Sequence, residues 1–183
     1  MNMTKVLVPL AEGCEELEAV TVIDLLRRAN ITVVTAGLEA GPVRASRGVV
    51  LVADKTLDEA LQDDYDMVVL PGGGPGADRL DADDRIRELL ISMANSEKFT
   101  AAICAAPKVL KSAGLLEGKQ ATCYPGVMQA GDLPGLDTDR RVVQDGKIVT
   151  SRGPGTAMDF ALQLVEILTD RNTRDQVEAG LVR

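Results

Sequence analysis

Cys104 is the residue whose type and position point most directly to chemistry. It follows a short apolar run, Phe99 to Ile103, that has the composition of a buried strand. The segment Ala106 to Gly114 has proline near its first turn and glycine at its end, which is typical of a short helix. Cys104 is therefore expected at a sharp turn from strand to helix, where free N–H groups stabilise a thiolate. We expect the pKa of the thiol to fall below its usual value of about 8.5.

A second interpretation of Cys104 is a buried structural residue, because free cysteine is among the most buried residue types. Its neighbours Ala102, Ala105 and Ala106 are small. They allow a tight turn and leave room for a substrate. Together with the strand–helix position, they favour the reactive interpretation.

The chain contains no histidine. This excludes Ser-His-Asp and Cys-His mechanisms as well as histidine metal sites. The three cysteines, Cys14, Cys104 and Cys123, are odd in number and widely spaced, so they predict neither a disulfide framework nor a zinc site. Proton transfer must then depend on carboxylates, tyrosine, lysine or the thiol, and we expect no metal and no cofactor.

A glycine run, Pro71 to Gly76, follows the apolar strand that ends at Leu70. It lacks the Gly-Lys-Ser/Thr ending of a Walker A loop and is not a dinucleotide fingerprint, so nucleotide binding is disfavoured. Ligands of open α/β sheets bind at the carboxyl ends of the strands, where this run and Cys104 should meet. We expect the N–H groups of Gly73 and Ala105 to form an oxyanion hole there.

Three glutamates open the first predicted helix. Glu15 and Glu16 are explained by the helix dipole, which favours carboxylates in a first turn. Glu18 lies one turn further on and can instead point towards Cys104. Buried there, it would have a raised pKa and could give or take a proton.

Length and composition fit one domain, residues 1–183, with a sizeable core. Hydrophobic residues make up 45% and charged residues 26%, which is ordinary for a soluble protein. The net charge of −8 argues against binding to nucleic acid or anionic membranes. No apolar run approaches the roughly 20 residues of a membrane span. The N-terminus does not resemble a signal peptide, so a cytoplasmic location is expected.

Strand and helix patterns alternate along the chain and predict an α/β domain with helices on both faces of a mostly parallel sheet. Asp145-Gly146 predicts a hairpin with a type I′ turn. The other predicted strands are 5–10, 31–38, 65–70, 99–103 and 120–123, with a separate hairpin over 43–53. The predicted helices are 14–29, 56–61, 84–95, 106–114, 156–168 and 171–179, with a helical turn over 126–131.

Four motifs together resemble the ThiJ/PfpI superfamily over essentially the whole chain, and most closely its YajL and parkinsonism-associated protein deglycase branch. They are Ala11–Glu18, Leu70–Gly73, Ala101–Pro107 and Thr150–Thr156. The resemblance implies a flavodoxin-like three-layer sandwich and a homodimer. It also implies a nucleophile elbow at Cys104, a hydrogen bond from Glu18 to the cysteine, and ready oxidation to a sulfinate. The pocket it implies comprises Glu15, Gly72, Tyr124, Gly153 and Pro154.

The dimer expectation has a second basis in the first helix. This helix carries Arg27 and Arg28 together with Glu15, Glu16 and Asp24. A two-fold axis would let these opposite charges pair between two copies of the chain.

Two positions depart from the family pattern. Ala105 stands where PfpI-type members carry histidine after the nucleophile, and Tyr124 stands where the deglycase branch has histidine before Pro125. Tyrosine is a poor base near neutral pH, because its usual pKa is about 10.

Two classes of function therefore stay open. One is a glyoxalase or protein deglycase, in which the Cys104 thiolate adds to a 2-oxoaldehyde or a glycated protein and Glu18 moves protons. The other is a non-enzymatic redox sensor or redox-regulated chaperone, in which peroxide oxidises Cys104. The open pocket of small residues favours the first, and the missing histidine favours the second.

Overall fold

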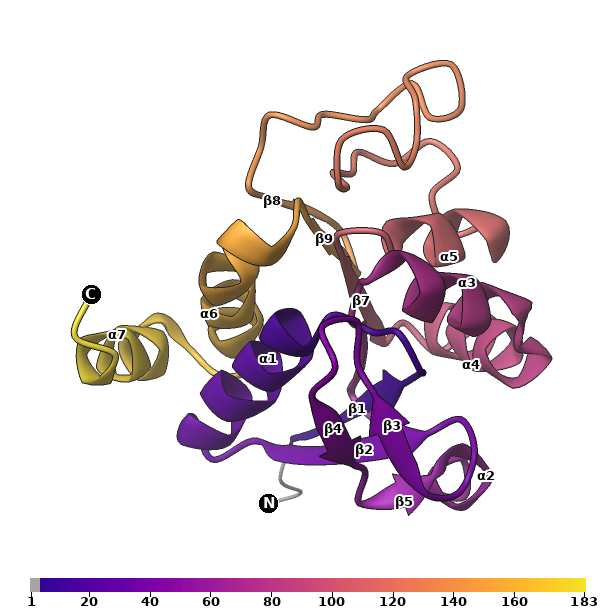
Figure 1. Ribbon diagram of the computed structural model, residues 1–183. Coiled ribbons are helices and arrows are strands. Elements are labelled where there is room, and N and C mark those ends of the chain that lie inside the picture. The colour runs from indigo at the N-terminus through magenta and orange to yellow at the C-terminus, as the bar shows by residue number, and fades with distance from the viewer. Residues whose placement is uncertain (1–3) are drawn as a thin grey trace.

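A seven-stranded sheet with helices on both faces forms the protein (Figure 1). The computed structural model describes residues 4–183. The strand order is β5-β2-β1-β6-β7-β9-β8, and all neighbouring strands are parallel except β8 and β9. Strands β3 and β4 form a separate antiparallel pair, as the sequence predicted. This mostly parallel, layered arrangement confirms the predicted α/β fold class.

The bounds of the elements agree with most of the sequence predictions. The strands are β1 Lys5–Leu10, β2 Thr32–Gly37, β3 Pro42–Arg44, β4 Val50–Val52, β5 Lys55–Thr56, β6 Met67–Leu70, β7 Phe99–Ile103, β8 Val142–Asp145 and β9 Ile148–Ser151. The helices are α1 Glu16–Arg28, α2 Leu57–Ala60, α3 Gly74–Ala82, α4 Asp84–Asn95, α5 Pro107–Ser112, the 3₁₀ turn Pro154–Thr156, α6 Ala157–Leu168 and α7 Arg171–Gly180.

Each face of the sheet has its own apolar core. On one face α1 packs against α6 and buries Val22, Leu26 and Phe160. On the other face α3, α4 and α5 cover the sheet and bury residues such as Leu80 and Leu90. Figure 1 shows these two groups of helices on opposite sides of the central strands. Strands β6 and β7 are covered on both sides, which is why they read as short continuous apolar runs.

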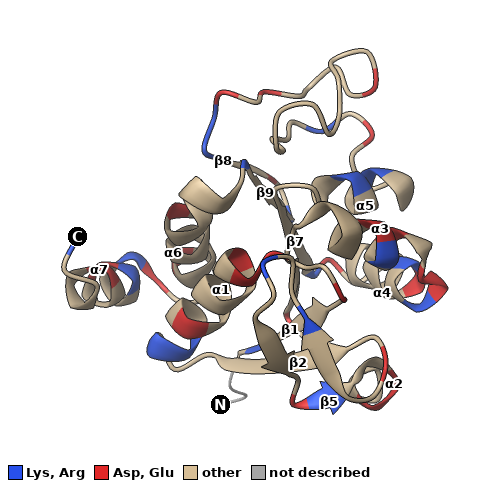
Figure 2. Ribbon diagram, viewed as in Figure 1, with Lys and Arg blue, Asp and Glu red and all other residues tan. Residues whose placement is uncertain are grey.

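Charges along α1 follow the helix dipole. Glu16 and Glu18 lie in its first turn, and Arg27 and Arg28 lie in its last turn (Figure 2). Carboxylates stabilise the positive amino end of a helix, and guanidinium groups stabilise its negative carboxyl end. The dipole explanation thus fits this helix, although Glu16 and Glu18 also have specific partners described below.

Helix α3 is the main element that the sequence analysis missed, because it begins inside the glycine run. Pro75 occupies its first turn, where proline fits without loss of a hydrogen bond. Gly76 lies against Cys14, and a Cβ on Gly76 would be 2.6 Å from the Cys14 Cα. The glycines here allow a helix to approach the loop after β1, which a purely local interpretation of glycine as a loop former does not reveal.

The predicted strand over 120–123 and helical turn over 126–131 are wrong. The segment between α5 and β8 is irregular, and Ala121 makes only an isolated bridge with Leu136. Its backbone is held instead by single contacts, for example Thr122 N–H donating to Thr150 Oγ1 at 2.9 Å. Strand β7 already pairs with β6 and β9, so no free edge is available there for a further strand.

The hairpin between β8 and β9 is confirmed, but its turn differs from the predicted type I′. Gly146 and Lys147 are its two central residues, and of these only Gly146 has a positive φ, at 61°. Glycine at the first central position is the pattern of a type II′ turn.

Within residues 4–183, none of the helices is long and apolar enough to cross a membrane.

Candidate active site

Cys104 lies directly after β7 in a left-handed backbone conformation, with φ at 64°. This conformation costs a residue other than glycine about 1–3 kcal/mol and persists only where the surroundings impose it. Two hydrogen bonds hold the Cys104 backbone in this conformation. Cys104 N–H donates to the Ser151 carbonyl, and Tyr124 N–H donates to the Cys104 carbonyl, both at 2.9 Å. The chain thus turns sharply from β7 into α5, as the sequence predicted.

Two backbone N–H groups meet the sulfur of Cys104. They belong to Gly73, whose φ is 86°, and to Ala105, and each lowers the pKa of the thiol. Gly73 lies at the carboxyl end of β6 just before α3, and Ala105 follows the cysteine. The structure therefore brings together the donor pair that the sequence suggested, and their role as an oxyanion hole stays a prediction.

The carboxyl group of Glu18 lies beside the same sulfur, although Glu18 belongs to α1. The side chain is fully buried, and its Oε2 accepts a 2.8 Å hydrogen bond from Gly72 N–H. Among the described residues, Oε1 has no hydrogen-bond partner. Burial raises the pKa of Glu18 to about 7, although the Gly72 N–H and the Cys104 thiol act in the opposite direction. Such a carboxyl group can both give and take a proton near neutral pH.

The expected low pKa of Cys104 is wrong for the resting site. Burial raises the pKa of the thiol to about 12, and the negative charge of ionised Glu18 adds to the increase. The N–H groups of Gly73 and Ala105 oppose this rise but do not outweigh it. Because Glu18 is the second-largest cause, a proton on its carboxyl group removes that charge and makes the thiolate easier to form. The two groups titrate as a coupled pair.

Gly72 lies against both the Glu18 carboxyl group and Cys104 and leaves no room for a side chain of its own. A Cβ at this position would lie 2.6 Å from both Cys104 Cβ and Glu18 Oε2, and 2.8 Å from the Ile103 carbonyl oxygen. Glycine is therefore a steric requirement of the contact between Glu18 and Cys104.

Glu15 and Glu16 hold the loop between β3 and β4 against the start of α1. Ser46 Oγ donates to Glu15 Oε2 at 2.9 Å and to Glu16 Oε2 at 3.0 Å. Glu16 also accepts from Arg47 N–H and Val49 N–H. Burial acts to raise the pKa of Glu16, but the hydrogen bonds that its carboxylate accepts together outweigh burial and lower the pKa. The dipole explanation given for these two residues is thus incomplete. Glu15 is half-buried, and its own N–H donates to the Gly72 carbonyl at 2.9 Å, which places it beside the candidate site.

Tyr124, Gly153 and Pro154 lie on the other side of the elbow. The Tyr124 ring contacts Gly153, because a Cβ on Gly153 would be 3.2 Å from ring atom Cδ2. Pro154 begins the 3₁₀ turn that leads into α6. Thr156 Oγ1 accepts from Gly153 N–H at 3.1 Å and lies 2.7 Å from Ser151 Oγ.

The sequence analysis missed the role of Ser151 and Thr156 in fixing this turn. Their hydroxyl groups are buried and hydrogen-bonded to each other, and the Ser151 carbonyl accepts a hydrogen bond from Cys104 N–H. A pair of hydroxyl residues around Gly153-Pro154 was the available signal.

The other two cysteines are fully buried and unpaired. Burial raises the pKa of Cys14 to about 11 and also raises that of Cys123. Cys123 Sγ donates to the Tyr124 carbonyl at 3.3 Å. These positions fit structural cysteines, whereas Cys104 is 8% exposed. Within residues 4–183, no three His, Cys, Asp or Glu side chains lie close enough together to hold a metal ion.

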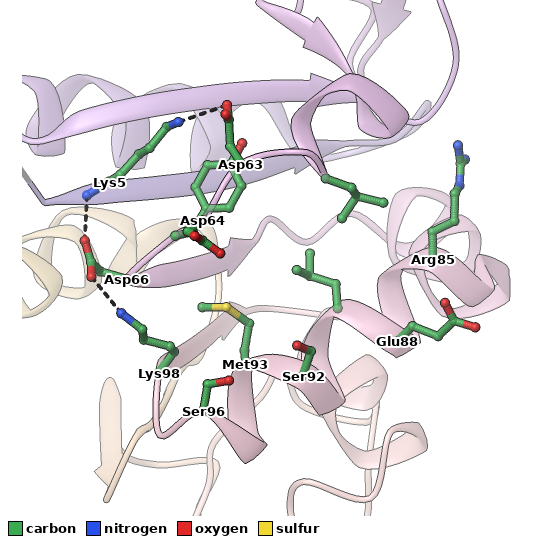
Figure 3. Close-up of a pocket in the computed structure, with 13 residues that line it drawn as sticks. Lys5, Asp63, Asp64, Asp66, Arg85, Glu88, Ser92, Met93, Ser96 and Lys98 are labelled. Atoms are coloured by element: carbon green, nitrogen blue, oxygen red, sulfur yellow. Dashed lines mark hydrogen bonds and ion pairs between the residues drawn. The ribbon is translucent and has the colours of Figure 1, made fainter.

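A groove with a volume of about 890 Å³ lies far from this chemistry. It opens at the amino ends of β1 and β6 and beside α4 (Figure 3). Its Asp63 pairs with Lys5 and its Asp66 with Lys98, so these charges are satisfied within the groove. Cys104 lies at the carboxyl end of the sheet, where parallel α/β sheets bind their ligands. We therefore place the candidate site at Cys104.

A three-layer α/β protein with a strained cysteine elbow and a buried glutamate beside the sulfur is the class that this fold and site define. The chain belongs to the DJ-1/PfpI family, because the sequence model of that family matches residues 4–167. The resemblance seen in the sequence is therefore confirmed.

Several known proteins are similar to this chain. Protein DJ-1 homolog B of Arabidopsis thaliana is 46% identical over 88% of this chain, which spans only 37% of that protein. Protein dj-1beta of Drosophila melanogaster is 42% identical over 96% of this chain and 95% of its own length. The glutathione-independent glyoxalase DJR-1.2 of Caenorhabditis elegans is 37% identical over 86% of this chain and 84% of its own length.

Solved structures agree with the fold over nearly the whole chain. The crystal structure of Drosophila melanogaster DJ-1beta has a TM-score of 0.94 at 40% identity, covering 99% of this chain and 98% of that one. The structure described as Toxoplasma gondii DJ-1, oxidized, has a TM-score of 0.91 at 41% identity, with 98% of each chain covered.

Replacement of Gly72 by alanine tests the close contact between Glu18 and Cys104. The new methyl group meets backbone and buried atoms that have no room to move, so we expect a loss of about 1–3 kcal/mol in the free energy of unfolding. Gly74→Ala is the matched control, because nothing lies within 4 Å of its Cβ position. Urea denaturation should show Gly74→Ala as neutral or slightly stabilising. Equal effects of the two substitutions would contradict the steric role of Gly72.

The raised pKa of Glu18 predicts a specific pH dependence of stability. The folded protein keeps the Glu18 proton up to about pH 7, whereas the unfolded chain releases it near 4.5. Stability is therefore lost as the pH rises from 4.5 through 7, by on the order of 3 kcal/mol for this group. Glu18→Gln lacks this titration. Its free energy of unfolding relative to wild type should rise by that amount between pH 4 and 8, measured by urea denaturation. A constant difference across this range would show that the Glu18 pKa is not raised.

Proposed function

We propose that this protein is a cysteine-dependent, cofactor-free enzyme that protects against carbonyl stress by converting 2-oxoaldehydes into 2-hydroxy acids. The observation that carries the proposal is the convergence on one sulfur of two N–H donors, from Gly73 and Ala105, and a buried carboxyl group with a pKa of about 7, from Glu18. Similarity to a glutathione-independent glyoxalase supports it.

The reaction begins with attack of the Cys104 sulfur on the aldehyde carbon of the substrate. The thiol proton passes to Glu18, a carbon–sulfur bond forms, and the aldehyde oxygen becomes an oxyanion that accepts hydrogen bonds from the elbow N–H groups. Glu18 is the nearest group able to move this proton, since the chain contains no histidine.

An internal proton transfer then completes the redox change without an external oxidant. Glu18 first gives the thiol proton to the oxyanion, so that its carboxylate is free to take the proton from the former aldehyde carbon. The electron pair of that C–H bond forms an enediolate, in which the hydroxyl proton passes to the former ketone oxygen. Glu18 then returns the proton that it took to the former ketone carbon. The first carbon is thereby oxidised to a thioester and the second is reduced to an alcohol. Water cleaves the thioester, which frees the 2-hydroxy acid and restores the thiol. The same attack on the adduct of a 2-oxoaldehyde with a protein amine or thiol would constitute protein deglycase activity.

A second candidate function is a peroxide sensor or redox-regulated chaperone. The observation that favours it is Glu18 Oε1, which is fully buried and has no partner among residues 4–183. Hydrogen peroxide adds one oxygen atom to the thiolate per molecule and leaves as water, so two equivalents give a sulfinate. A protonated Oε1 can then donate to a sulfinate oxygen. The absence of histidine removes the general base that is most common in enzymes, and this also favours the second candidate.

Turnover of methylglyoxal separates the two candidates. Wild type should produce lactate, Cys104→Ser should lose at least about a hundredfold in kcat/KM, and Glu18→Gln should lose about 10²–10⁴-fold. Glu12→Gln is the control, because Glu12 is an exposed carboxylate on the loop after β1.

If wild type shows no turnover above Cys104→Ser, the enzymatic proposal is wrong. Intact-mass analysis during a peroxide titration then tests the sensor. Cys104 should gain two oxygen atoms and stop there in wild type, whereas Glu18→Asp, whose shorter side chain weakens the hydrogen bond, should accumulate a different oxidised species.

We also propose that the protein is a homodimer through α1 and the β3–β4 hairpin. Leu17 and Val20 are 49% and 47% exposed on α1, and Val50 and Val52 are 50% and 82% exposed on β4. Exposed apolar groups of this kind mark interaction surfaces. The charge pairing expected from the sequence is not the basis, because Arg28 pairs with Asp24 at 2.7 Å and Arg27 with Asp54 at 3.1 Å within one chain.

Light scattering at micromolar concentration should give the mass of a dimer. Val52→Asp should shift the mass towards that of a monomer, because a carboxylate would be buried in the apolar contact. Val182→Asp is the control, since Val182 is 92% exposed near the end of the chain. A monomer mass for wild type, or the same shift in both variants, would overturn the proposed interface.

A cytoplasmic location remains part of this proposal. It is supported by three cysteines that are all unpaired, as is usual where thiols are kept reduced.

A further inference from the structure

Tyr124 is an unusual side chain in a protein that has only two tyrosines, two phenylalanines and no tryptophan. Tyr65 and Phe160 are buried, and Phe99 is half-buried. Tyr124 alone among these four is largely open to solvent, with 50% of its surface exposed. An exposed aromatic ring is available to a ligand, whereas a buried one is used by the core.

The backbone of Tyr124 is held rigidly at the cysteine elbow. Its N–H donates to the Cys104 carbonyl at 2.9 Å, and its own carbonyl accepts from Val127 N–H at 3.1 Å. The latter bond closes a turn with Pro125 and Gly126 at its centre, and Gly126 has a φ of 90°. Proline followed by a glycine of positive φ is the signature of a type II turn. The ring thus starts from a fixed point next to the reactive residue.

The ring itself rests on Gly153, the position where a Cβ would be 3.2 Å from ring atom Cδ2. Gly153 lies two residues after Ser151, whose carbonyl accepts the Cys104 N–H. The position of the ring therefore depends on the Cys104 backbone in two ways. The Tyr124 N–H bonds to the Cys104 carbonyl, and Gly153 follows closely after Ser151, which bonds to the Cys104 N–H. The ring edge formed by Cδ2 and Cε2 lies against Gly153, and the exposed half of the side chain is free to contact a molecule that approaches the elbow.

We infer that Tyr124 determines specificity by forming an aromatic wall that favours electrophiles carrying a flat apolar group next to the reacting carbon. For the enzyme proposed above, on which this inference rests, the preferred substrate class is aryl 2-oxoaldehydes over methylglyoxal. Offset or edge-to-face contact between two rings stabilises a complex enough to change a rate about two- to tenfold. The contribution comes from the ring and not from proton transfer, because a phenol is a poor base near neutral pH.

Alkylation of Cys104 measures this selectivity without any need for turnover. The sulfur displaces iodide from iodoacetamide or from its phenyl derivative iodoacetanilide, and peptide mass spectrometry follows the labelling of Cys104 alone. The readout is the ratio of the second-order rate constants, iodoacetanilide over iodoacetamide. The ratio cancels any change in the reactivity of the thiol itself.

Two conservative variants test the wall. Tyr124→Phe keeps the ring and should keep the ratio of wild type within twofold. Tyr124→Leu keeps an apolar side chain that can fold in the same place, but it removes the ring, so the ratio should fall about two- to tenfold. The same ratio in wild type and in both variants would overturn the inference, as would a fall in Tyr124→Phe as large as that in Tyr124→Leu.

Kinetics with phenylglyoxal and methylglyoxal distinguish the inference from the proposed function. The readout is the kcat/KM for phenylglyoxal divided by that for methylglyoxal. If this ratio falls in Tyr124→Leu and is unchanged in Tyr124→Phe, both the inference and the proposed function are supported. Turnover with an unchanged ratio overturns the inference alone. If neither aldehyde is turned over, the glyoxalase proposal is wrong, and the alkylation ratio decides whether Tyr124 selects aromatic electrophiles at this site.

Discussion

The left-handed backbone of Cys104 is the constraint on which the rest of the site depends. A cysteine adopts this conformation only when other parts of the fold impose it. Here β9 supplies the Ser151 carbonyl, the irregular segment after α5 supplies the Tyr124 N–H, and the loop after β6 brings Gly72 against the cysteine. Three regions far apart in the sequence therefore determine where one sulfur lies. The sheet order makes this possible, because β7 lies between β6 and β9.

The same proximity creates an electrostatic problem that the site uses for chemistry. A carboxylate and a thiolate cannot both be stable in a poorly hydrated space, since like charges repel strongly there. The pair therefore carries its proton on one group or the other. With the proton on the sulfur, Cys104 is protected; with the proton on Glu18, the thiolate is stabilised by the N–H groups of Gly73 and Ala105. This exchange supplies the proton transfers of the proposed enzyme, and it also forms the thiolate that peroxide would oxidise in a sensor.

The candidate site and the proposed dimer surface are connected through the start of α1. Glu16 fixes the loop between β3 and β4, while Glu18, two residues later, reaches the sulfur. The exposed apolar residues of α1 and β4 lie on the solvent side of these contacts. Burial of that surface in a dimer would restrain the segment that carries Glu18. In the proposed dimer, association and reactivity would thus be linked by one short stretch of helix.

The sequence by itself determined the α/β class, the family and most elements, because these follow from local signals. Phe99–Ile103 and Asp84–Asn95 were predicted with their observed bounds, since an apolar run and a helical repeat are visible in neighbouring residues. Cys104, Glu18, Gly73 and Ala105 were also singled out correctly as neighbours. Only the tertiary structure decided the helix beginning in the glycine run, the irregular course of 118–141 and the raised pKa of Cys104. Close backbone approach, pairing partners and burial depend on distant residues, and no local pattern records them.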